Sequence, residues 1–76
     1  MLELSEKWIR YLLTHPETGM GYYIVSVVLK NGRRFDQVIV DSGFITKVRG
    51  EEGIPFDVSE IDQIIVTHDK WEFRKT

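Results

Sequence analysis

The sequence predicts a small α+β or mostly β domain, in which an N-terminal helix precedes a strongly bent antiparallel meander of four to five strands. Residues 22–40 form a long run of β-branched and aromatic residues around Asn31-Gly32. Asn-Gly tolerates the positive φ angles of a tight hairpin turn, so this run predicts two paired strands. Before it, residues 6–14 carry apolar side chains at helical spacing, which indicates one amphipathic helix.

Length and composition limit the class of protein. Seventy-six residues indicate one domain, residues 1–76, which buries only about 60–65% of its unfolded surface. There is no cysteine, so disulfides and thiolate metal sites are excluded. A formal net charge of −2 argues against a surface built throughout for phosphate backbones. Neither a membrane-spanning run nor a secretory leader is visible, so we expect a cytoplasmic protein without a membrane partner.

The helix is expected over residues 6–14. Ser5 is placed to cap it, and Leu4 can pack on Ile9 as a hydrophobic staple. Pro16 sets its end, because the residue before a proline disfavours helix. Apolar side chains cover about half of its circumference, namely Leu2, Leu4, Trp8, Ile9, Tyr11, Leu12 and Leu13. One sheet face needs a narrower stripe, so the helix is expected in a groove or against a second surface such as another subunit.

The hairpin strands are expected at residues 22–29 and 33–40. A two-residue turn would set Val27 opposite Asp36 and mix charge into both faces. A three-residue loop, with Gly32 left-handed as a bulge residue, gives a cleaner apolar face. In that register the pairs are Leu29 with Arg33, Val27 with Phe35, Val25 with Gln37, and Tyr23 with Ile39.

The predicted hairpin has two apolar faces. One carries Tyr23, Val25, Val27, Leu29, Phe35 and Ile39. The other is too apolar to face only water, and it holds Tyr22, Ile24, Ser26, Val28, Arg34, Asp36, Val38 and Val40. Large exposed apolar patches mark contacts, so we expect self-association either through the spare flank of the helix or through this second face, at Ile24, Val28, Val38 and Val40.

The remaining elements follow from turn signals. Asp41-Ser42-Gly43 predicts a second tight turn, followed by a third strand at residues 44–49. Asp57 and Glu60 have the spacing of a capping box, which predicts a short helical turn before a fourth strand at residues 63–68. Residues 71–74 alternate again and could form a fifth strand.

The segment Val27 to Phe35, VVLKNGRRF, resembles the strand-turn-strand opening of the Sm motif, and the leading helix is similar to the Sm one. This resemblance implies a small SH3-type or Sm-like barrel. The chain departs from the Sm pattern at Gln37, where the motif has glycine, and at Gly43 and Thr46, where RNA-binding members have aspartate and asparagine. The RNA-binding residues are therefore not carried over. The alternative architecture is an open antiparallel sheet with the helix on one face and a dimer mate on the other.

No pattern of residues predicts catalysis. His15 and His68 are the two histidines, whereas a metal site needs at least three ligands and supporting residues. The carboxylates cluster near turns, where capping and solvation explain them. No serine or threonine lies in a nucleophile-elbow context. We therefore expect neither an enzyme nor a bound cofactor or metal.

A basic and aromatic set is the remaining candidate binding site, and it comprises Arg34, Lys47, Arg49, Lys70, Trp71 and Arg74. Cations beside flat aromatic rings are used to bind single-stranded nucleic acid. The simpler interpretation is that the rings pack in the fold while the cations keep the protein soluble. With the acidic charge balance, this favours a non-catalytic interaction domain that acts through a protein partner or self-association over a domain that binds single-stranded RNA or DNA.

Overall fold

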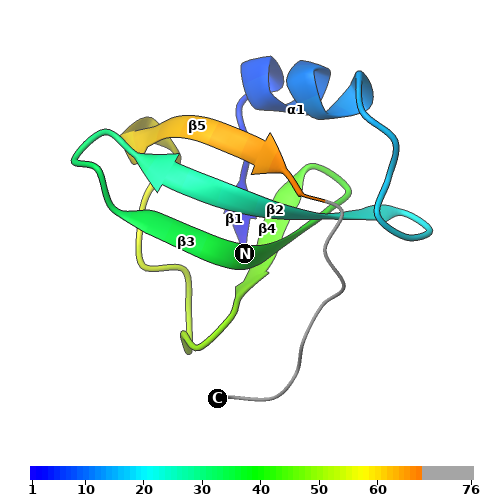
Figure 1. Ribbon diagram of the computed structural model, residues 1–76. Coiled ribbons are helices and arrows are strands. Elements are labelled where there is room, and N and C mark those ends of the chain that lie inside the picture. The colour runs from blue at the N-terminus through cyan, green and yellow to red at the C-terminus, as the bar shows by residue number, and fades with distance from the viewer. Residues whose placement is uncertain (68–76) are drawn as a thin grey trace.

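The computed structural model describes residues 1–67 (Figure 1). Its elements are β1 (Leu2–Glu3), α1 (Glu6–Leu13), β2 (Tyr22–Leu29), β3 (Arg34–Asp41), β4 (Phe44–Val48), the 3₁₀ turn η1 (Val58–Glu60) and β5 (Ile61–Val66). The strands form one antiparallel sheet in the order β1-β4-β3-β2-β5. The predicted fold class, an N-terminal helix followed by a bent antiparallel sheet with a short helical turn before β5, is confirmed.

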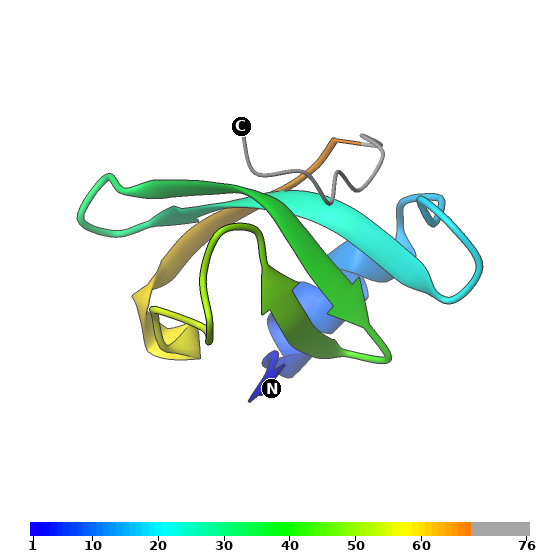
Figure 2. The same cartoon turned by 90° about the horizontal axis from the view of Figure 1, so that it is seen from below.

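The sheet curls into an open half-barrel, and α1 lies in its hollow (Figure 2). In the described part of the chain, β1 and β5 are the two edges, so the sheet is curled but not closed. We call the face toward α1 the inner face and the opposite one the outer face. The inner face and α1 share a core of Leu4, Trp8, Leu12, Val25, Val27, Leu29, Val38, Val40, Ile45, Val48, Phe56, Ile61 and Ile64.

The helix begins after Ser5, as predicted, and ends one residue earlier than predicted. Ser5 occupies the N-cap, but its side chain makes no capping hydrogen bond. Its backbone carbonyl accepts from the N–H groups of Trp8 and Ile9 at 3.1 and 3.2 Å. Trp8 is buried against the sheet, whereas Leu13 at the end of α1 is exposed. The apolar stripe is therefore only partly covered, which agrees with its predicted excess width.

The predicted three-residue hairpin loop is confirmed. The N–H of Leu29 donates to the carbonyl of Arg33 at 2.8 Å, and Val27 lies opposite Phe35. Gly32 has a φ of 90°, a left-handed conformation that glycine adopts without steric cost. The loop thus sets the register of the first pairs on each side of the turn.

The register changes further along the hairpin. Val25 pairs with Val38 and Ile24 with Ile39, because the register shifts between Val25 and Val27. The predicted pairings of Val25 with Gln37 and of Tyr23 with Ile39 are therefore wrong. One extra residue has been accommodated in β3, which is the definition of a β-bulge.

The bulge lies at Asp36 and Gln37, which both fall opposite Ser26 in this register. Gln37 has a φ of 57°, in the left-handed region that only a few per cent of non-glycine residues adopt. A single extra residue exchanges the two faces of a strand beyond it. Val38 and Val40 consequently point into the core, where they are fully buried.

Because the two faces of β3 are exchanged beyond the bulge, one of the predicted contact surfaces is wrong. The surface predicted from Ile24, Val28, Val38 and Val40 cannot act as one exposed patch, because Val38 and Val40 belong to the core. Ile24 does remain on the outer face but is 0% exposed. The flank of α1 is the predicted contact that remains.

The later turns follow the sequence closely. Ser42 and Gly43 have φ angles of 54° and 83°, which confirms the second tight turn. The capping box is also formed, since the Asp57 N–H donates to Glu60 Oε1 at 2.8 Å and the Asp57 side chain accepts from the Glu60 N–H. β5 begins and ends two residues earlier than predicted. The strand predicted at residues 71–74 lies outside the described residues.

The bulge requires a left-handed backbone conformation at residue 37, which can be tested by substitution. A β-branched side chain is strained in the left-handed region, whereas asparagine tolerates it. We expect Gln37→Val to be less stable than Gln37→Asn by about 1–2 kcal/mol, because both variants lose the glutamine contacts but only valine adds strain. Urea unfolding followed by tryptophan fluorescence measures this difference. Equal free energies of unfolding for the two variants would contradict the left-handed assignment.

Candidate functional site

Three members of the predicted basic and aromatic set, Arg34, Lys47 and Arg49, lie within the described residues. Arg34 pairs with Val28 and Lys47 with Ile39, which places both on the outer face. On β2 the partners of these two levels, Val28 and Ile24, are four residues apart, a distance of about 13 Å along the strand. The other members, Lys70, Trp71 and Arg74, lie outside the described residues. Arg34 and Lys47 thus share a face but are spread along it, while Arg49 follows the end of β4, where its N–H donates to the Gln37 carbonyl at 3.1 Å.

Arg34 is held in a polar cluster with Ser26 and Asp36. Ser26 Oγ donates to Asp36 Oδ1 at 2.6 Å, and Arg34 Nε donates to the same oxygen at 2.9 Å. Arg34 Nη2 also lies 3.4 Å from Ser26 Oγ. Ser26 is 2% exposed, so the cluster anchors a buried hydroxyl at the bulge. The predicted placement of Asp36 beside Arg34 is correct, and the carboxylate offsets one charge of the basic set.

The cluster is not a catalytic arrangement. The hydrogen bond from Ser26, together with that from Arg34, holds the pKa of Asp36 below its ordinary value of 3.8. A carboxylate with a lowered pKa is a weak general base near neutral pH, so it does not activate the Ser26 hydroxyl. Among residues 1–67, no group of three or more histidine, aspartate or glutamate residues is placed to hold a metal ion.

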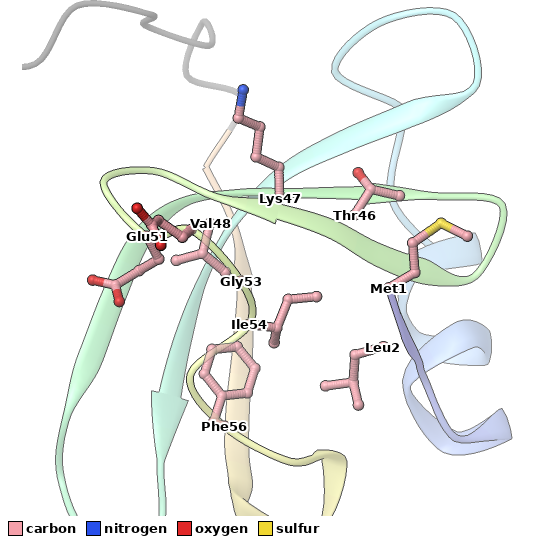
Figure 3. Close-up of a pocket in the computed structure, with 10 residues that line it drawn as sticks. Met1, Leu2, Thr46, Lys47, Val48, Glu51, Gly53, Ile54 and Phe56 are labelled. Carbon is pink, nitrogen blue, oxygen red and sulfur yellow. The ribbon is translucent and has the colours of Figure 1, made fainter.

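A cleft of about 490 Å³ lies between the N-terminus, β4 and the segment before η1 (Figure 3). Leu2, Ile54 and Phe56 form its apolar floor, while Lys47 points away from them (Figure 3). Phe56 also packs on Phe35, with 5.2 Å between ring centroids, so this floor is an extension of the core. Glu51 and Glu52 add carboxylates at the rim. The lining thus mixes core side chains with charges of both signs.

A second concave surface, the Leu13 groove, lies between α1 and the β3–β4 turn. Its volume is about 250 Å³, and its lining comprises Ile9, Leu12, Leu13, Glu17, Tyr23, Val40, Ser42 and Gly43. Leu12 and Val40 are buried and form the floor, whereas Leu13 is 73% exposed at the lip. Glu17 is the one charged residue among those that line it.

One wall of the groove, the turn wall, is the β3–β4 turn, whose backbone at Gly43 lies close to Ile9 of α1. Gly43 has a φ of 83°, and a Cβ atom there would lie 3.2 Å from Ile9 Cδ1. Glycine adopts this conformation without strain, and any larger residue would also have to displace the end of the Ile9 side chain slightly. The N–H of Leu4 donates to the Gly43 carbonyl at 2.9 Å, which ties the turn to the start of α1.

The opposite wall comes from the segment between α1 and β2. Thr18 Oγ1 accepts from the N–H of Ile24 at 2.9 Å, and the Tyr23 hydroxyl lies 3.4 Å from the His15 carbonyl. These contacts hold the Glu17 region beside Leu13. The sequence predicted a spare apolar flank on the helix, but the floor residue Val40 was predicted on the other face, because the bulge was missed.

Comparison of the chain with protein-family models, curated proteins and solved structures gave no match. The Sm-like resemblance therefore rests on the hairpin and leading helix alone. Among residues 1–67, no helix has the length and apolar character needed to cross a membrane.

The polar cluster predicts how Asp36 titrates. The pKa of Asp36 is lower in the folded protein than in the unfolded chain, so its ionised form stabilises the fold at pH values above the unfolded-state pKa of 3.8. This stabilisation is lost as the pH falls from 3.8 through the folded-state pKa. We expect Ser26→Ala and Arg34→Gln each to raise the Asp36 pKa, because Ser26→Ala removes the hydrogen bond that is its largest single cause and Arg34→Gln removes the guanidinium that lowers it through both a hydrogen bond and its charge. Carboxyl ¹³C chemical shifts recorded against pH measure both changes. An Asp36 pKa that stays the same in Ser26→Ala would contradict the contribution of the Ser26 hydrogen bond.

Proposed function

We propose that this protein is a small non-catalytic interaction domain that binds a protein partner through the Leu13 groove. The observation that carries the proposal is the 73% exposure of Leu13 beside a groove with a buried apolar floor. Interface cores are formed by apolar side chains that enter such concave surfaces, while exposed leucine in water gains nothing. The polar cluster around Ser26 offers no comparable surface, since its hydrogen bonds are made internally.

The lining indicates the chemistry of the partner. An apolar side chain fits the floor at Leu12 and Val40, and a neighbouring lysine or arginine complements Glu17 at the rim. A second copy of the chain is the other occupant to consider, and it is distinguished by the mass of the free protein. A short peptide with one apolar anchor is the simplest probe of this surface.

Binding of single-stranded RNA or DNA ranks second as a function. It is favoured by the common outer-face position of Arg34 and Lys47. Against it stand the ion pair of Arg34 with Asp36 and the net charge of −2. Phosphate contacts supply most of the affinity of such binding, so one partly neutralised cation weakens it.

The groove can be tested with a random peptide library displayed on phage and the immobilised protein. We expect enriched peptides to carry a large apolar residue next to lysine or arginine. Leu13→Glu should lower their affinity by at least about tenfold, because it places a charge in the apolar contact. Met20→Glu is the matched control, since Met20 is 99% exposed and is not among the residues that line the groove. Fluorescence anisotropy with labelled synthetic peptides gives the affinities.

Three outcomes would count against the groove. They are enrichment without an apolar anchor, equal binding by Leu13→Glu and wild type, and equal losses in Leu13→Glu and Met20→Glu. Binding of a labelled single-stranded RNA at about 50 mM salt, weakened by both Arg34→Gln and Lys47→Gln, would instead favour the second function. A wild-type mass of two chains that Leu13→Glu reduces to one would assign the groove to self-association.

A further inference from the structure

We propose that the outer edge of β5 pairs with β5 of a second copy of this chain, so that two curled sheets join into one. The proposal goes beyond the Leu13 groove, because the two surfaces lie on opposite flanks of α1. Ile9 and Leu13 line the groove, whereas Trp8 and Tyr11 face β5. The argument starts from the strand order, in which β5 ends the sheet beside β2 in residues 1–67.

The two edges of the sheet differ in their protection. β1 has two residues, and very short edge strands resist further pairing. β5 has six residues, IDQIIV, of which four are isoleucine or valine. It contains neither lysine nor proline, the residues that natural proteins place on edges to block association. By length and composition, β5 is the edge suited to accept another strand.

The backbone of β5 presents hydrogen-bonding groups outward. The N–H of Thr67 donates to the Ile24 carbonyl at 3.3 Å, which continues the ladder with β2. Successive residues of an antiparallel strand direct their N–H and carbonyl groups to opposite edges. Residues 63, 65 and 67 therefore bond toward β2, and Ile64 and Val66 direct theirs outward. A partner for these groups must itself be an extended strand.

The structure leaves room along this edge. A cleft of about 280 Å³ is lined by Trp8 and Tyr11 of α1 and by residues 62–65 of β5. Because consecutive strand residues alternate between the faces, a cleft that reaches all four runs along the edge and not over one face. The two rings meet edge to face with centroids 6.3 Å apart, which gives an incoming strand an aromatic wall to pack against.

The charge pattern of β5 favours a second copy as the occupant. Antiparallel pairing about a two-fold axis at Ile64 sets Ile64 opposite its own counterpart and places the two copies of Asp62, the residue at which β5 shifts register against β2, at opposite ends of the paired stretch. Asp62 is the one charged residue of β5, so this register brings no like charges together. Like charges directly opposite would destabilise a strand pair. The same patch then serves both subunits, as a two-fold interface requires.

The test uses a substitution that removes one outward N–H. Val66→Pro deletes a donor that does not bond to β2, and proline is tolerated on the open side of edge strands. Val66→Thr is the matched control, since it keeps the N–H and the β-branched shape. A contact this small predicts a weak dimer, so the average mass of wild type and Val66→Thr should rise from one chain toward two between about 10 µM and 1 mM. Val66→Pro should stay at one chain in sedimentation equilibrium.

Amide hydrogen exchange of the wild-type chain provides a second measurement that needs no variant. The Ile64 and Val66 amides should exchange more slowly as concentration rises, while Gln63, bonded toward β2, should not change. A wild-type mass of one chain up to about 1 mM, or unchanged exchange at Ile64 and Val66, would overturn the proposal. A dimer lost in Leu13→Glu but kept in folded Val66→Pro would also overturn it and would leave the function of the groove intact.

Discussion

The bulge at Asp36 and Gln37 is the constraint on which the rest of the fold depends. Without it, the hairpin register would keep Val38 and Val40 on the outer face and bring Gln37 and Ile39 inward. A non-glycine residue in the left-handed region costs about 1–2 kcal/mol, whereas burying each valine contributes about 1.5–3 kcal/mol. Packing therefore outweighs the backbone strain. The bulged strand also bends, which helps the sheet to curl around α1.

The surfaces proposed for binding are consequences of that curl. A helix in the hollow of a curved sheet covers the core with one stripe and leaves its two flanks beside different strands (Figure 2). On one flank, Leu13 lines a groove whose floor contains Val40. Val40 lies on the inner face only because of the bulge. On the other, Trp8 borders the open edge of β5. The two flanks of α1 thus border one apolar groove and one strand edge.

Local signals in the sequence were sufficient for the turns and the helix. Asn31-Gly32 and Ser42-Gly43 demand particular backbone angles, and the Asp57–Glu60 box satisfies its own hydrogen bonds. The bulge could not be found in this way, because glutamine has no preference for the left-handed region and its conformation is imposed by the burial of Val38. The candidate site was found in part, since helical spacing revealed the spare flank at Leu13. Its turn wall depends on a contact between residues far apart in the sequence, the hydrogen bond from the Leu4 N–H to the Gly43 carbonyl.

The most direct test of the account is the register of β2 against β3 in solution, read from backbone nuclear Overhauser effects in an isotope-labelled sample. The account predicts contacts that join Val25 with Val38 and Ile24 with Ile39, while Val27 remains opposite Phe35. Contacts that join Val25 with Gln37 and Tyr23 with Ile39 would show a regular ladder. That result would return Val38 and Val40 to the outer face and remove the floor of the Leu13 groove.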